Sequence, residues 1–128
     1  MQDRFKFRYL FDNKLYEVVL IDFKLNKIYL KIDDKYPLRT KFDDKKLIQC
    51  TGLKDKNGKL IYEGDIINIW CKNFTKNQIS EVKFCKERAA FTFDYITDFE
   101  RIVPCTMDKT EIEVIGSIYE NPELLEQL

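Results

Sequence analysis

The sequence predicts a mostly β fold in which an N-terminal β-meander is followed by a small SH3-like β-barrel and a short C-terminal helix. Short runs in which apolar and polar residues alternate cover much of the chain, a pattern typical of half-buried strands. Hydrophobic residues make up 45% of the chain and aromatic residues 14%, enough to fill a core. The 128 residues suit one domain or two small joined modules. We assign residues 1–46 to the meander with a connecting loop and residues 47–128 to the barrel with its helix, and expect one structural unit.

The first expected strand has an aromatic face and a basic face, because successive side chains of a strand point to opposite sides. The aromatic residues are Phe5, Phe7, Tyr9 and Phe11, and the basic residues are Arg4, Lys6 and Arg8. Further strands are expected at residues 15–21 and 28–32, and the polar residues 33–44, which include Pro37, read as a loop. The basic residues are candidate partner contacts. The alternative, an edge strand with one solvated face, is favoured, since a single-strand nucleic-acid binder needs its aromatics on the charged face.

The middle of the chain carries the clearest turn signals. Asn57-Gly58 predicts a hairpin with a type I′ turn, in which both central residues have positive φ. Gly64-Asp65 predicts a tight corner before a buried strand over residues 66–70. These four residues are expected to serve folding rather than chemistry. Trp70 ends that strand and is either a core residue, which is favoured, or a binding anchor.

Later segments continue the β pattern and end in a helix. Strands are expected at residues 47–50, 81–84, 90–93 and 112–118, with a hairpin turn around residues 86–88. Asn121 is a suitable helix N-cap, and Pro122 and Glu123 suit the first turn. Such a short helix must dock on something through its apolar stripe, which consists of Leu124, Leu125 and Leu128.

The residue types argue against an enzyme or a metal site. The chain has no histidine, which excludes a histidine triad, a histidine general base and a mixed Cys/His zinc site. The thiols of Cys50, Cys71, Cys85 and Cys105 lack Cys-x-x-Cys spacing, so we expect reduced, metal-free packing residues. The four glycines, Gly52, Gly58, Gly64 and Gly116, are too scattered for a phosphate-binding loop and are expected in turns. We therefore expect no cofactor.

The charge distribution suggests self-association. Residues 1–88 carry 20 bases and 13 acids, and residues 89–128 carry 2 bases and 9 acids, so the whole chain is neutral. Ordinary solvated surface is the favoured explanation, but a basic front and an acidic tail can also attract each other within one chain or between copies. The exposed strand edges of a small β protein and the short helix both favour an oligomer. The apolar runs are too short to cross a membrane.

Two long motifs and the opening strand resemble the YopX proteins, which are small proteins encoded by phages and prophages of low-GC bacteria. Residues 51–67 read TGLKDKNGKLIYEGDII, residues 113–125 read EVIGSIYENPELL, and residues 4–8 read RFKFR. The resemblance covers the start, the middle and the end of the chain. It implies a β-rich phage accessory protein in a bacterial cytoplasm and transfers no catalytic residue.

Three classes of function follow, in decreasing order of support. The first is a non-catalytic protein-interaction or assembly module that acts on a host or phage process. The second is a small nucleic-acid-binding β-barrel, against which the zero net charge and the pI near 6.3 argue. The third is an enzyme without histidine.

Overall fold

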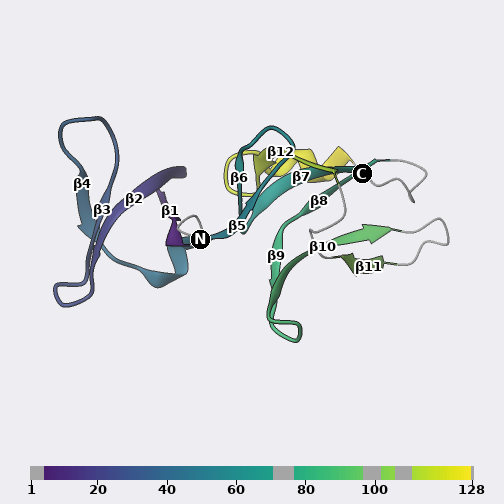
Figure 1. Ribbon diagram of the computed structural model, residues 1–128. Coiled ribbons are helices and arrows are strands. Elements are labelled where there is room, and N and C mark those ends of the chain that lie inside the picture. The colour runs from purple at the N-terminus through teal and green to yellow at the C-terminus, as the bar shows by residue number, and fades with distance from the viewer. Residues whose placement is uncertain (1–4, 71–76, 97–101, 106–110, 128) are drawn as a thin grey trace.

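The computed structural model describes residues 5–70, 77–96, 102–105 and 111–127, and twelve strands lie in these ranges (Figure 1). The strands are β1 (Phe7–Phe11), β2 (Lys14–Asp22), β3 (Lys27–Leu30), β4 (Leu38–Lys41), β5 (Leu47–Lys54), β6 (Leu60–Tyr62), β7 (Asp65–Trp70), β8 (Gln78–Glu81), β9 (Lys83–Cys85), β10 (Ala90–Ile96), β11 (Ile102–Cys105) and β12 (Glu111–Ser117). Two 3-10 helices are η2 (Asp44–Lys46) and η3 (Pro122–Gln127). The mostly β prediction is confirmed. No helix in the described ranges is long and apolar enough to span a membrane.

The N-terminal half forms an antiparallel sheet with the strand order β4-β3-β2-β1-β5-β6. Asp12 and Asn13 connect β1 to β2 with φ angles of 52° and 63°, as a type I′ turn requires, and Phe11 pairs with Lys14 across it. Because β1 also pairs with β5, the boundary expected after residue 46 falls inside this sheet. How the chain divides into domains stays a prediction.

The segment expected to be a loop over residues 33–44 contains a strand, which corrects that expectation. Pro37 stands directly before β4, where it removes no ladder hydrogen bond, and β4 pairs with β3. The Asp33 carboxylate accepts hydrogen bonds from the backbone N–H groups of Lys35 (2.8 Å) and Tyr36 (3.0 Å), which shapes the turn between β3 and β4. A proline at the start of an edge strand is therefore compatible with the sheet.

Two smaller sheets make up the rest, with the strand orders β12-β7-β8 and β11-β10-β9. The hairpin expected around residues 86–88 joins β9 to β10. Buried side chains from β6, β7, β10 and β12 and from the β8–β9 link form the core of this half: Ile61, Ile67, Ile69, Val82, Phe93 and Ile112. A second cluster, centred on Tyr9, Ile28 and Leu30, lies on one face of the N-terminal sheet.

The expected closure into a barrel is absent from the strand pairing of the described residues. Closure would need a backbone ladder between the sheet that contains β6 and the sheet that contains β12. Instead, the β5–β6 turn contacts β12: the Lys56 N–H donates to the Ile112 carbonyl (2.9 Å), and the Val114 N–H donates to the Asp55 carboxylate (2.9 Å). This turn joins the sheets without closing them into a barrel.

The chain ends in η3, a 3-10 helix at the position where the sequence predicted a short helix. The Asn121 side chain does not cap η3 as expected; it accepts a hydrogen bond from the Ser117 N–H (3.3 Å) at the end of β12. Leu124 and Leu125 are half-buried, and Leu128 lies outside the described residues.

Candidate functional site

The corner between β6 and β7 brings three parts of the chain together. Gly64 has a φ of +86°, which a glycine adopts freely, and its N–H donates to the Val82 carbonyl (2.9 Å). The Asp65 carboxylate accepts a hydrogen bond from the Tyr62 N–H (2.8 Å) and so closes the corner on itself. The Ile118 N–H donates to the Gly64 carbonyl (2.9 Å), which ties the corner to the segment after β12. Gly64 and Asp65 therefore form a corner, at the place where the sequence predicted one.

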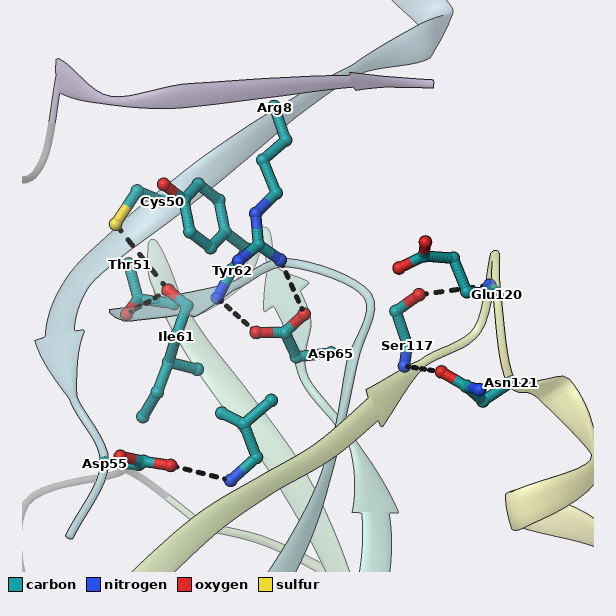
Figure 2. A network of polar contacts seen from close by, with 11 residues as sticks. Arg8, Cys50, Thr51, Asp55, Ile61, Tyr62, Asp65, Ser117, Glu120 and Asn121 are labelled. Carbon is teal, nitrogen blue, oxygen red and sulfur yellow. Dashed lines mark hydrogen bonds and ion pairs between the residues drawn. The ribbon is translucent and has the colours of Figure 1, made fainter. Parts of the chain in front are cut away.

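Arg8 on β1 reaches into this corner (Figure 2). Its guanidinium lies 3.8 Å from the centre of the Tyr62 ring, and its Nη1 atom lies 3.5 Å from Oδ1 of Asp65. The Arg8 side chain is 22% exposed and Asp65 is 2% exposed. The aromatic–basic alternation of β1 is present, but for Arg8 the expected solvated face is wrong because the β6–β7 corner packs against it. Lys6 is exposed, and Arg4 lies outside the described residues.

Burial controls the protonation of this corner. Burial raises the pKa of Asp65 to about 6, although the Tyr62 N–H and the Arg8 guanidinium act in the opposite direction. Burial also raises the pKa of Glu63, and the nearby Glu81 carboxylate raises it further. The long Arg8–Asp65 separation agrees with a carboxylate that loses more by desolvation than it regains from its partner.

A cleft of about 460 Å³ lies over this corner, between the β1–β2 hairpin and the end of β12. Its charged lining consists of Arg8, Glu17, Lys59, Asp65 and Glu120. Figure 2 shows Ser117, Glu120 and Asn121 on the η3 side, where the Glu120 N–H donates to Ser117 Oγ (3.1 Å). Two cations and three carboxylates nearly balance, so the cleft can hold polar groups but favours neither anions nor cations strongly.

Asp55 holds the second polar contact between the sheets, and the alternating strand pattern does not point to it. Its carboxylate accepts hydrogen bonds from the N–H groups of Asn57 (2.9 Å), Lys59 (2.9 Å) and Val114 (2.9 Å). Burial alone would raise the pKa of Asp55, but these three donors outweigh it and lower the pKa below its usual value. The signal in the sequence is the Asp-x-x-Gly spacing of Asp55 and Gly58, because an aspartate at the first turn position bonds its own turn.

The turn at Asn57-Gly58 differs from the predicted type I′ geometry. Gly58 has a φ of +83°, but Asn57 is not among the residues with positive φ. The Gly58 N–H donates to the Asp55 carbonyl (3.0 Å), and the Asp55 N–H donates to the Lys59 carbonyl (2.8 Å). The loop therefore has three residues and ends in a left-handed glycine, since the Asp55 side chain favours that longer turn.

The remaining sequence candidates lie apart from the cleft. Trp70 is half-buried, and the Lys56 ammonium lies 4.1 Å from the centre of its ring. Gly116 is not a turn glycine: it lies within β12, where a Cβ atom would meet Asn121 Oδ1 at 2.7 Å. Cys50 and Cys85 are free thiols, and the side chains of Cys71 and Cys105 lie outside the described part of the chain. Reduced, metal-free thiols stay a prediction.

The strands β2, β3 and β4, which we call the arm (residues 14–41), present a second candidate surface. Figure 1 shows the arm extending away from β5–β8 and β12. Of the nine large hydrophobic side chains that are exposed in the described residues, six belong to the arm. They are Val19, Leu20, Phe23, Leu25, Ile32 and Tyr36. Two of them are on β2, two on the β2–β3 turn and two on the β3–β4 loop, so apolar side chains are available for contact at both ends of the arm.

A larger cavity, of about 610 Å³, opens at the base of the arm. Tyr9, Phe11 and Phe42 contribute its aromatic lining. The Tyr9 hydroxyl donates to the Lys41 carbonyl (3.2 Å) and accepts from the Asp43 N–H (2.9 Å). The polar end of Tyr9 is thus satisfied within the protein, which allows its ring to be buried at the base of the arm.

Comparison with known proteins gives one consistent family. The model of the YopX protein family matches residues 6–126. A curated relative, the SPbeta prophage-derived uncharacterized protein YopX of Bacillus subtilis (strain 168), is 34% identical over 70 residues, which span 54% of this chain and about half (52%) of that protein. The crystal structure of protein YopX from Bacillus subtilis has a TM-score of 0.64 at 22% identity and covers 95% of this chain and 98% of its own. That of protein EF1440 from Enterococcus faecalis has a TM-score of 0.53 at 26% identity and covers 94% and 96%.

Proposed function

Because the chain belongs to the YopX protein family, we propose that it is a phage or prophage accessory protein that acts without catalysis, as a protein-interaction or assembly module. The prophage setting is supported by the name of the curated Bacillus relative. A bacterial cytoplasm is the compartment in which such a protein would act.

The observation that carries this proposal is the exposed apolar surface of the arm. Phe23 is 76% exposed and Tyr36 is 77% exposed. Burial of the apolar area of these rings against a partner would be favourable, because that area is now in contact with water. By contrast, Asp65 in the cleft is 2% exposed and already engaged by Arg8 and the Tyr62 N–H, so it offers little surface to a substrate.

A photo-crosslinking amino acid at Leu20 tests this proposal in cells that carry the phage or prophage. Leu20 lies on the arm and is exposed, and Lys86, on the exposed turn between β9 and β10, provides the matched control position. We expect a discrete adduct from Leu20 and none from Lys86. Equal yields at the two positions, or no adduct at either, would contradict an interaction function for the arm.

Nucleic-acid binding is the second candidate, and one observation favours it. The exposed aromatic rings of Phe23 and Tyr36 share the arm with several lysines, the combination that single-strand binders use. Fluorescence anisotropy with labelled single-stranded DNA and RNA separates the two functions. An affinity that falls steeply with added salt would support this second function.

A further inference from the structure

We propose that the arm of one copy docks on the acidic surface formed by β12 and η3 of a second copy. This inference rests on the proposed function, because it names the partner of the same apolar surface. We call the second surface the acidic end and define it as residues 111–126.

The acidic end carries one sign of charge. It contains five glutamates and neither lysine nor arginine. The glutamates are Glu111, Glu113, Glu120, Glu123 and Glu126. Glu113 lies 3.4 Å from the Lys56 ammonium, and the other four are exposed. Ile115, Leu124 and Leu125 lie among them, half-buried, so the surface also offers apolar contacts.

The arm has the complementary composition. Its residues 14–41 carry seven bases and four acids, a net charge of +3, together with the six exposed apolar side chains. Lys31 and Lys35 stand beside Ile32 and Tyr36, but Asp33 and Asp34 lie between them, so this loop is neutral and the net positive charge of the arm comes from its other residues. A surface of this kind fits an acidic partner with an apolar centre.

Within one chain only the base of the arm approaches the acidic end: Leu15, Tyr16 and Glu17 line the cleft together with residues 114–117, 120 and 121, and the exposed apolar side chains of the arm do not. Figure 1 shows β3 and β4 on one side of β1 and β5, and η3 on the other side. The attraction between them is therefore available to a second copy. Because the arm and the acidic end are different surfaces, the contact is head-to-tail and must close into a ring or extend into a filament.

Reversal of charge on each surface tests the contact. The variant K31E/K35E alters the arm, E120K/E123K alters the acidic end, and K83E/K86E reverses two exposed lysines elsewhere as a matched control. Light scattering coupled to size exclusion measures the mass of each protein. We expect the wild type and the control to exceed 15.4 kDa at high concentration and to return towards it in high salt.

Each surface variant should remain near 15.4 kDa by itself. An equimolar mixture of the two should form dimers, because the unaltered arm of E120K/E123K can then meet the unaltered acidic end of K31E/K35E. Circular dichroism on each variant establishes that it is folded. A wild type of 15.4 kDa at all concentrations and salts would overturn the proposal, as would a control that loses mass as the arm variant does. A monomeric wild type that still gives the Leu20-specific photo-adduct would overturn self-docking alone and leave the interaction function standing.

Discussion

At the scale of single residues, two glycines with nearly the same backbone conformation have different surroundings. A Cβ atom at Gly58, with a φ of +83°, would meet nothing within 4 Å, whereas at Gly64, with a φ of +86°, it would lie 2.7 Å from the Tyr119 ring. Alanine at residue 58 should cost about 1 kcal/mol, the penalty of a left-handed backbone. Alanine at residue 64 adds a steric clash and should cost roughly 2–4 kcal/mol. Urea unfolding of both variants measures the difference.

The role of Tyr119 in that difference can be isolated. The variant Y119L removes the ring that a Cβ atom at residue 64 would meet, so G64A should cost less in the Y119L background than in the wild type. Equal costs of G64A and G58A in the wild type would show that backbone conformation alone explains both glycines.

Single residues also show where local sequence signals are sufficient. The turn at Asp12-Asn13 has positive φ at both central positions, while Asn57-Gly58, the stronger type I′ signal, has it only at Gly58. The difference lies in Asp55, whose side chain bonds the turn and also β12. A tertiary hydrogen bond of this kind cannot be deduced from the turn sequence. For the same reason, the alternation of β1 predicts a solvated Arg8, which instead packs on Tyr62.

At the scale of elements, the β5–β6 turn contacts β12 through the Asp55 carboxylate, the backbone of Lys56 and the Lys56–Glu113 ion pair. The variant D55A removes an acceptor that three backbone N–H groups share, among them the Val114 N–H of β12. Because these donors become unsatisfied next to a largely buried position, we expect a loss of about 2–4 kcal/mol in the free energy of unfolding. Thermal or denaturant unfolding measures it.

Asp33 supplies the matched control for that prediction. Its carboxylate also accepts two backbone N–H bonds, but within an exposed turn and without a partner on another sheet. D33A should therefore destabilise the protein less than D55A. If the two variants lose the same stability, Asp55 serves only its own turn and does not join the sheets.

Most strands could be predicted from the sequence, and the exceptions have physical causes. The alternation of apolar and polar residues locates β1, β2, β3 and β12. β7 is instead located by its isoleucines, because both of its faces are buried. The sequence predicts a loop in place of β4, since Leu38–Lys41 is short and polar and follows Pro37. An edge strand of this kind gains its stability from the neighbouring strand β3 rather than from its own composition.

At the scale of the whole molecule, the sequence predicts the strands better than it predicts how the sheets join. Closure of a barrel depends on long-range pairing, and here the β5–β6 turn, rather than a strand ladder, contacts β12. The cleft over the β6–β7 corner combines residues from β1, β2, β7 and β12, which are far apart in sequence. The Gly64-Asp65 corner can be predicted from the local sequence. Its contacts with Arg8 and Tyr119 cannot, because only the fold brings these residues to the corner.

The stability of the whole molecule should depend on pH through Asp65. Its pKa is about 6 in the folded protein, against an ordinary value of 3.8. Below about pH 4 the group is protonated in both the folded and the unfolded states and contributes no difference. As the pH rises from about 4 to 6, the unfolded state releases the proton first, so the folded state loses relative stability, by about 3 kcal/mol at most. Above about pH 7 the loss is complete and constant.

The variant D65N removes this titration and keeps a side-chain oxygen that can accept from the Tyr62 N–H. The free energy of unfolding of D65N minus that of the wild type should therefore increase between about pH 4 and pH 6 and then level off. Urea unfolding at several pH values measures both proteins, and titration of the other carboxylates, including Asp55, cancels in the difference. A difference that decreases over the same pH range would mean that Arg8 lowers the pKa of Asp65. The Arg8–Asp65 pair would then stabilise the contact between β1 and the β6–β7 corner. A raised pKa of Asp65 means instead that the buried pair lowers the free energy of unfolding at neutral pH.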